Sequence, residues 1–305
     1  MWARMLLLVA LALVGIAGAP ARGAAAPPPP ETLSCFDSGS GPGVVLIPSL
    51  SGCAFGFRHV VSALHAAGYR TLIVEPLGVG FSPRPERADY SLIAQADRVA
   101  TELERRGVRD ALVVGHGIGG AVALRLAYRH PGLVRGVVSI EGGPAESAAT
   151  PGFRRAMKVA RWMRLIAGSG WIKGKFAKHL RSVSADPAWV TEAVVDSYFA
   201  GVERDPGAAL RAFSAMGRAP EPESLGVRLP EIRCPVVLLL GGFRHKGGPP
   251  AEDVARLAER LPRFAQCVVP GVGAFVQEER PGAIVSAVRE MTELVADTSR
   301  CAIAP

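Results

Sequence analysis

Apolar residues in this chain fall into two kinds of pattern that alternate along the sequence. Short continuous apolar runs are typical of strands in a parallel sheet, which are buried on both faces. Apolar residues spaced three and four apart are typical of helices that bury one face. Their alternation predicts an α/β domain with a mostly parallel sheet and helices on both faces. The predicted strands span residues 33–37, 44–48, 70–75, 111–114, 134–140, 235–240 and 265–269, and the predicted helices span residues 58–68, 91–106, 121–130, 251–261 and 283–295.

The alternation is interrupted between residues 142 and 230, where helical patterns occur without a convincing strand pattern. Gly168-Ser169-Gly170 and two Asp-Pro pairs break these helical patterns. A helical insertion between two strands of a parallel sheet predicts a cap over the carboxyl edge of that sheet. At 305 residues, the chain has the length of one large domain with such an insertion. We therefore expect a core formed by residues 33–141 and 231–298 and a helical cap formed by residues 142–230.

The first residues of the chain have the pattern of a secretory signal peptide. Arg4 precedes an apolar run at residues 5–17, and small residues follow at 19–21. This arrangement predicts a signal peptide over residues 1–21, followed by a stiff proline-rich tether over residues 22–32. We expect a secreted or periplasmic protein. The alternative is a protein anchored in a membrane by an uncleaved N-terminus.

Export would place all five cysteines in an oxidising compartment, where disulfides form. Cys35 and Cys53 flank an early predicted strand and are one candidate pair. Any two of Cys234, Cys267 and Cys301 are the other candidate pair, and one thiol is left over. The cysteine spacings match no zinc-site pattern. We expect neither a metal nor a cofactor.

The strongest charge feature lies in the expected cap. Residues 151–185 contain nine Lys or Arg residues and no acid. On a helix at about 100° per residue, Arg154, Lys158 and Arg161 share one face. A solvated helix face explains this pattern, and the alternative is a surface for anionic membranes or an acidic partner. The net charge of +8 falls to +7 if Arg4 leaves with the signal peptide. Nucleic acid is not expected, because an exported chain without a recognition motif gives it no site.

A glycine-rich turn follows the predicted strand at 111–114 and leads directly into a helix. The turn reads Gly115-His116-Gly117-Ile118-Gly119. Strand, tight turn and helix form the layout of the nucleophile elbow, in which G-x-S-x-G places a serine on a strained turn. The outer glycines are present, but the central residue is Gly117 instead of serine. Glycine also relieves the strain of a positive φ at this position.

Four segments together resemble the α/β-hydrolase superfamily over about residues 33–295. The resemblance implies an α/β-hydrolase fold with a cap at its usual place, whereas activity must be argued from the site itself. The segments are the elbow, Ile47-Pro48-Ser49-Leu50-Ser51-Gly52, Glu75-Pro76-Leu77-Gly78-Val79-Gly80-Phe81-Ser82, and Val269-Pro270-Gly271-Val272-Gly273-Ala274-Phe275 with Glu278-Glu279-Arg280-Pro281.

The resemblance also locates the catalytic positions of the family in this chain. The nucleophile position is Gly117, and Ala274 stands where the histidine base follows Pro-Gly-x-Gly. The loop at 241–246, where the acid usually lies, has no carboxylate. Glu141 occupies an alternative acid position, and His245 is the titratable base of that loop, where we expect a solvated side chain. Without nucleophile and base, a neutral hydroxyl cannot be activated, so the triad is not in use.

The backbone N–H groups at the elbow do not depend on which side chains are present. The oxyanion hole of the family uses backbone N–H groups, here those of Ile118 and of Ser49 or Leu50. These groups favour a small carbonyl-containing or anionic ligand, and the alternative is a pocket filled by cap side chains. His116 is expected to form structural hydrogen bonds, because a base needs a nucleophile within reach.

Three interpretations of function follow. The first is an exported α/β-hydrolase-like protein that lacks triad-based hydrolysis and acts as a ligand-binding or interaction protein. The second is a hydrolase of an ester or related substrate that uses non-standard residues such as Glu141 or His245. The third is a membrane-associated structural protein held by its N-terminus and the basic cap.

Overall fold

The computed structural model describes residues 31–149, 151–245 and 247–301. The expected signal peptide at 1–21, most of the tether at 22–32, and Lys246 lie outside the described residues. In the described part of the chain, seven strands form one sheet in the order β1-β3-β2-β4-β5-β6-β7. Strand β1 pairs with β3 in antiparallel fashion and the other neighbours are parallel. The strands are β1 (Cys35–Ser38), β2 (Gly43–Ile47), β3 (Arg70–Val74), β4 (Ala111–His116), β5 (Val134–Ile140), β6 (Val236–Gly241) and β7 (Phe264–Val269).

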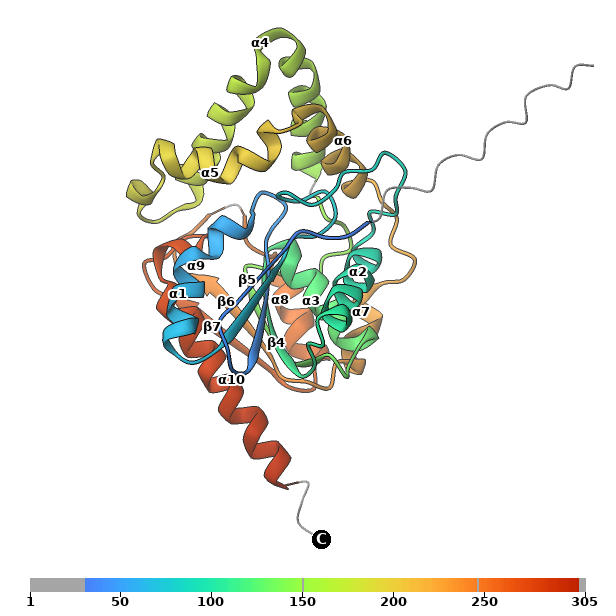
Figure 1. The fold of residues 1–305 in the computed structure, drawn as a ribbon, viewed down its shortest axis with the longest axis vertical. Coiled ribbons are helices and arrows are strands. Elements are labelled where there is room, and N and C mark those ends of the chain that lie inside the picture. Colours follow the sequence, from blue (N-terminus) through green and yellow to red (C-terminus); the bar gives the residue numbers. More distant parts are fainter. Residues whose placement is uncertain (1–30, 150, 246, 302–305) are drawn as a thin grey trace, which may run out of the picture. The chain divides into compact units, whose positions relative to one another are not determined.

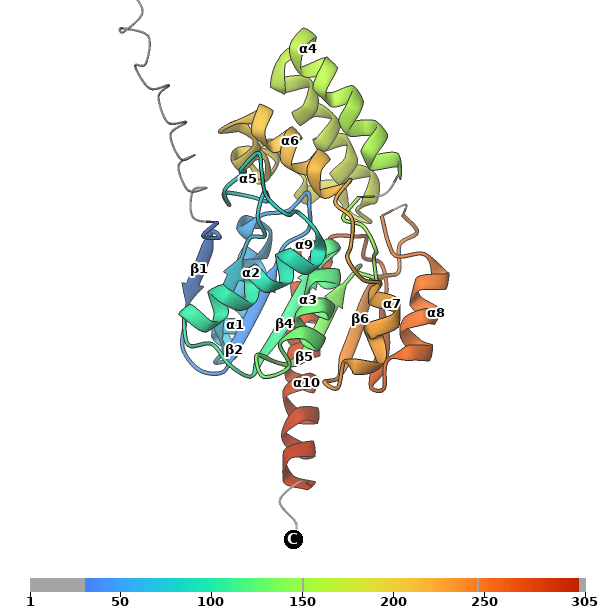
Figure 2. The same cartoon turned by 90° about the vertical axis from the view of Figure 1, so that its right-hand side faces the viewer.

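Helices cover both faces of the sheet (Figures 1 and 2). Helices α1, α9 and α10 lie on one face, and α2, α3, α7 and α8 lie on the other. The predicted fold class, a mostly parallel sheet between helical layers, is confirmed. The helices of the core are α1 (Arg58–Ala66), α2 (Leu92–Arg105), α3 (Ile118–Arg129), α7 (Leu225–Arg228), α8 (Ala251–Arg260), α9 (Val276–Glu279) and α10 (Pro281–Cys301).

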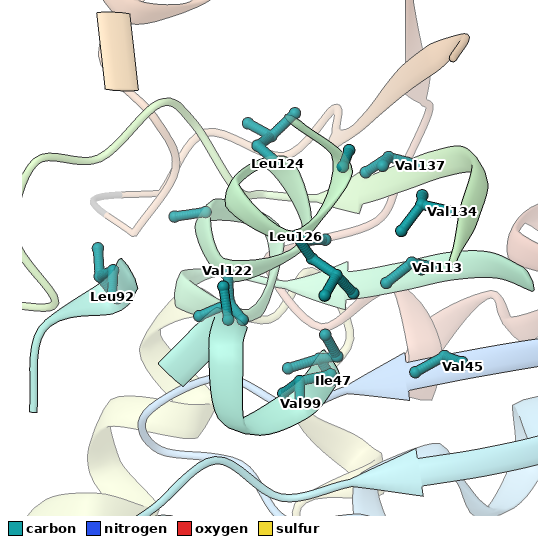
Figure 3. Packing of buried hydrophobic residues seen from close by; sticks show 14 of the residues in the cluster. Val45, Ile47, Leu92, Val99, Val113, Val122, Leu124, Leu126, Val134 and Val137 are labelled. Atoms are coloured by element: carbon teal, nitrogen blue, oxygen red, sulfur yellow. The ribbon is translucent and has the colours of Figure 1, made fainter. Parts of the chain in front are cut away.

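The two faces of the sheet have separate apolar cores because alternate residues of each strand point to opposite sides. In β2, Val45 and Ile47 face the core that contains α2 and α3 (Figure 3). Val44 and Leu46 of the same strand face the core that contains α1 and α10. All four side chains are 0% exposed, which explains why the sequence of β2 is continuously apolar.

Between β5 and β6 the chain forms helices and no strand in its described residues. Helices α4, α5 and α6 lie beyond one edge of the sheet, as a cap (Figure 2). The predicted break at Gly168-Ser169-Gly170 does not end a helix: α4 is helical throughout and changes direction along its length (Figure 1). The pair Asp205-Pro206 begins α6, because the Asp205 carboxylate accepts the N–H of Ala208. The elements are α4 (Pro151–Val183), α5 (Glu192–Glu203) and α6 (Pro206–Met216).

A buried arginine joins both ends of this cap to the core. Arg125 of α3 is 0% exposed and lies 3.5 Å from Glu146, where the chain enters the cap. Its Nε atom lies 3.4 Å from Glu221, where the chain leaves the cap. Glu221 also accepts the N–H of Leu92 at the start of α2 (2.6 Å), and Glu146 accepts that of Leu225 at the start of α7 (3.1 Å). One guanidinium therefore organises two helix N-termini and both cap connections.

The predicted Cys35–Cys53 disulfide is wrong, because both cysteines are free thiols. The Cys35 Sγ atom faces Glu102, at 4.0 Å, and the Cys53 Sγ atom faces the carbonyl oxygen of Ser197 in the cap, at 3.9 Å. Burial raises the pKa of Cys53 to about 12, which keeps this thiol protonated.

The second predicted disulfide also fails, because Cys234 and Cys267 are free. Cys267 lies in the middle of its strand. It pairs with Leu239 within β7, whereas Cys234 precedes β6, so the two lie at different heights along the sheet. The side chain of Cys301 lies outside the described residues. Within the described ranges, no helix has both the length and the apolar character that a membrane span requires.

Replacing Arg125 with Met should lower the free energy of unfolding by about 3–5 kcal/mol, because Glu221 would remain buried without its counter-charge. Urea unfolding of the purified protein measures this loss. Arg129→Met is the matched control on the same helix. Arg129 pairs with Asp97 at 32% and 39% side-chain exposure, and its loss should cost about 1 kcal/mol or less. Equal losses in the two variants would contradict the anchoring role of Arg125.

Candidate functional site

The sharp turn between β4 and α3 is formed around Gly117. Its backbone angles are φ 55° and ψ −116°, in a region that strains a residue with a side chain. The Gly117 N–H donates to the carbonyl oxygen of Ile140 (2.8 Å) on the neighbouring strand. At Gly119 an added Cβ would lie 2.2 Å from the carbonyl oxygen of Ile47, so only glycine permits this approach. The structure therefore contains the elbow backbone that the sequence predicts, without a side chain at its centre.

The space beside Gly117 is bounded by the loop after β2. A Cβ added at Gly117 would lie 3.2 Å from the Cβ of Ser49, which is tighter than an ordinary contact. Ser49 is 7% exposed and its hydroxyl lies 3.5 Å from that of Ser51. Gly117 and Ile118 are themselves partly exposed, although the residues before and after them are buried. The elbow is thus accessible from outside but offers no reactive side chain.

The position of the missing base is covered by the cap. Ala274 is 6% exposed, and its N–H donates to the carbonyl oxygen of Val183 (2.8 Å) at the end of α4. Ala274 belongs to an apolar cluster with Leu180 and Val183 of α4 and Tyr198 of α5. Close packing leaves little room for a larger side chain in such a cluster. Around Ala274, cap side chains therefore fill the space, which is the alternative to an open pocket that the sequence left open.

Glu141 and His245 form a buried pair beside the elbow. Glu141 follows β5 with φ 53°, and its Oε1 atom accepts the N–H of Gly241 (2.5 Å). The Oε2 atom lies 3.4 Å from Nε2 of His245, and the two side chains are only 3% and 4% exposed. The expectation that the His245 side chain is solvated is therefore wrong. The loop after β6 folds back over Glu141, so closely that a Cβ at Gly248 would lie 2.7 Å from the carboxylate.

Both ring nitrogens of His245 are engaged. Nδ1 lies 3.1 Å from the backbone N–H of Gly247, which can only donate, so Nδ1 carries the lone pair. Nε2 then carries a ring proton and lies 3.4 Å from Oε2 of Glu141. A general base needs a free lone pair directed at the proton that it takes. In this conformation His245 has none.

His116 is also saturated with hydrogen bonds, as predicted for a structural histidine. Its Nε2 atom donates to the carbonyl oxygen of Ala274 (3.1 Å), and its Nδ1 atom accepts from the side-chain amide of Gln277 (3.1 Å). The ring packs edge-on against Phe275, with centroids 5.1 Å apart. Burial lowers the pKa of His116 to about 4, so the ring is neutral at pH 7. It links β4 to the segment that follows β7.

The candidate oxyanion groups lie at the elbow. Ile118 is the first residue of α3, so its N–H has no acceptor within its own helix. In the described ranges, no protein atom accepts the N–H of Ile118, Ser49 or Leu50. A helix N-terminus with free N–H groups attracts carbonyl oxygens and anions. The backbone N–H groups of these three residues are therefore the donors at the elbow that have no acceptor within the described chain and that a ligand could use.

Two neighbouring glutamates, Glu278 and Glu279, hold the cap onto this region. Glu278 accepts from Arg58 (2.6 Å) and from the hydroxyl of Tyr198 in α5 (2.6 Å). Glu279 accepts the backbone N–H groups of Ala185 (3.0 Å) and Gly273 (3.1 Å). The signal that could have identified them is an acidic pair inside an otherwise apolar segment.

The charged residues of the cap are only partly described. Lys173 pairs with Asp196 (2.7 Å) and Glu203 (3.0 Å) of α5, so part of the basic charge is neutralised within the cap. The side chains of Lys158 and Arg161 lie outside the described residues, and binding of anionic membranes stays a prediction.

Among the described residues, no group of three or more His, Cys, Asp and Glu side chains could hold a metal ion.

Comparison with known proteins points to one superfamily. The sequence profile of the family described as "alpha/beta hydrolase fold" matches residues 42–182, from β2 to the end of α4. Pig bifunctional epoxide hydrolase 2 is 34% identical over 113 residues, which is 37% of this chain and 20% of that protein. The chain thus spans about a fifth of that relative's length. Haloalkane dehalogenase 2 of Mycobacterium tuberculosis is 25% identical over 267 residues, which is 83% of this chain and 89% of that protein.

The fold comparison agrees with the sequence comparison. A thermophilic esterase from Thermogutta terrifontis superposes with a TM-score of 0.68 at 21% identity, covering 86% of this chain and 93% of the esterase. At this identity the likeness concerns the fold alone. Strand order, elbow backbone, helical insertion and family profile agree: the chain has the α/β-hydrolase fold, and residues 42–182 match the family profile of that fold.

Proposed function

We propose that this hydrolase-like chain binds a ligand at its elbow and does not hydrolyse it through a covalent intermediate. The observation that carries the proposal is Gly117 at φ 55°, an elbow backbone without a nucleophile. Covalent hydrolysis in this fold requires a side chain that attacks and a base that takes its proton. Neither Gly117 nor Ala274 has an atom that can do this.

The polar groups around the elbow support binding. The N–H groups of Ile118 and of Ser49 or Leu50 have no protein acceptor, and the elbow is partly exposed. A carbonyl or carboxylate oxygen would satisfy these donors, with additional attraction from the N-terminus of α3. The ligand class that fits is a small carbonyl-containing or anionic molecule.

The contact between Glu141 and His245 favours a second candidate, a hydrolase in which this pair activates water. The names of the relatives, an epoxide hydrolase and a haloalkane dehalogenase, concern enzymes and agree with this candidate at a coarse level. Against it, the lone pair of His245 is directed at Gly247 and its Nε2 proton faces the carboxylate. We therefore prefer the binding function.

Purified wild-type protein should show no turnover above the buffer rate on a panel of esters, epoxides and haloalkanes, because neither Gly117 nor Ala274 can attack a substrate or take a proton and the lone pair of His245 is directed at Gly247. The variants Glu141→Ala and His245→Ala should give the same background. Turnover at an ordinary enzymatic rate, about 1 s⁻¹ or faster, that either substitution abolishes would establish the second candidate instead.

Substituting Gly117 with Ser should lower the free energy of unfolding by about 1–3 kcal/mol, because serine would be strained at φ 55° and would crowd Ser49. It should not create esterase activity, since the base is still missing. Urea unfolding and the same ester panel measure the two effects. Gly132→Ser is the matched control, because a Cβ at Gly132 meets nothing within 4 Å. A Gly117→Ser protein as stable as the control would show that the turn is not strained.

A further inference from the structure

A cavity lined by several charged residues lies at the edge of the sheet opposite the elbow, where the parallel strands begin. Its volume is about 280 Å³, and its lining includes Arg70, Arg109, Asp110 and Arg135. Asp110 precedes β4, whereas Gly117 follows it, so the length of a six-residue strand separates the two places. At about 3.3 Å per residue this is about 20 Å. The cavity is therefore independent of the elbow and of the function proposed for it.

The lining of this cavity has an excess of positive charge. Three arginines line it together with one acid, Asp110. Arg70 is neutralised by two hydrogen bonds to Asp37, at 2.9 and 2.6 Å. Among the described residues, neither Arg109 nor Arg135 has a carboxylate within 4.0 Å. Asp110 is the one acid in the lining, and among the described residues it forms no ion pair with either arginine.

Arg135 is the informative residue, because two of its guanidinium nitrogens are buried without partners although the residue as a whole is partly exposed. The Nε and Nη2 atoms have almost no exposed surface and no hydrogen-bond acceptor in the described chain. Burying unpaired polar atoms costs about 1–3 kcal/mol, and more when the group is charged. The pairing of β4 with β5 explains the position of the Arg135 side chain. Ala111 pairs with Val134 but Leu112 pairs with Gly136, so Arg135 is the extra residue of a β-bulge.

We propose that this cavity binds a phosphoryl group, as inorganic phosphate or a phosphate monoester, through Arg135 and Arg109. The planar guanidinium fork of Arg135 matches the spacing of two phosphate oxygens. Because Nε and Nη2 have almost no exposed surface, this contact requires the Arg135 side chain to turn towards the cavity that it lines, where the ligand would satisfy its unpaired N–H groups. Arg109, exposed on the rim, would contact a third oxygen. The negative charge of Asp110 repels any anion. The attraction of two unpaired arginines outweighs this repulsion, and the net attraction is largest for a dianion.

The test is isothermal titration of the purified chain with inorganic phosphate at constant ionic strength. Wild type should bind one phosphate saturably, and Arg135→Gln and Arg109→Gln should each bind it about tenfold or more weakly. Arg218→Gln, an exposed arginine outside this cavity, is the charge-matched control and should bind like wild type. Glycerol phosphate in a parallel titration distinguishes the sources: tighter binding than phosphate indicates an ester ligand, and equal or weaker binding indicates the free ion.

Two results would overturn the proposal. One is the absence of saturable phosphate binding by folded wild type. The other is binding that neither arginine substitution weakens, which would place the ion elsewhere, for example at the elbow. If Arg135→Gln does not fold, the exposed Arg109 decides the matter, because its side chain is not part of the packed interior.

Discussion

The backbone turn at Gly117 determines what this molecule can do at the carboxyl edge of its sheet. The turn needs a positive φ, 55° here, to lead β4 directly into α3. In the family pattern a serine accepts this strain and uses the exposed position for attack. With glycine the strain is removed together with the nucleophile. What remains is a helix N-terminus at which the N–H of Ile118 has no acceptor among the described residues, and this is the basis of the binding function that we propose.

The other polar groups near this turn serve to hold the cap. Glu278 and Glu279 accept from residues in and after the cap helices, and Arg125 pairs with acids at both ends of the insertion. His116 links β4 to the segment after β7. Most of their hydrogen-bonding capacity is used inside the protein, although Oε2 of Glu278 and two nitrogens of Arg125 have no hydrogen-bond partner among the described residues. These groups stabilise the packing of the cap on the core.

Local sequence patterns were sufficient to predict the strands of the sheet and the loss of two catalytic positions. The apolar run at 44–48 became β2 (Gly43–Ile47), because a strand between two helical layers must be apolar on both faces. The losses at Gly117 and Ala274 could also be predicted, since a motif position is defined by its neighbours in sequence. The Glu141–His245 pair could not, because it joins loops about a hundred residues apart through the way one folds over the other. The disulfide predictions failed for a related reason. The pairing of Cys234 with Cys267 depended on the height of Cys267 along the sheet, which strand register sets, and Cys53 instead faces a carbonyl oxygen of the cap.

The central claim is that the elbow binds a carbonyl ligand and leaves it unchanged. The most direct measurement is NMR of the ¹⁵N-labelled protein during titration with a small ester. The account predicts saturable shifts of the Ile118 amide signal, and of Ser49 or Leu50, while the ester signals stay intact. Hydrolysis of the ester, or an acyl group that stays attached to the protein, would contradict the account.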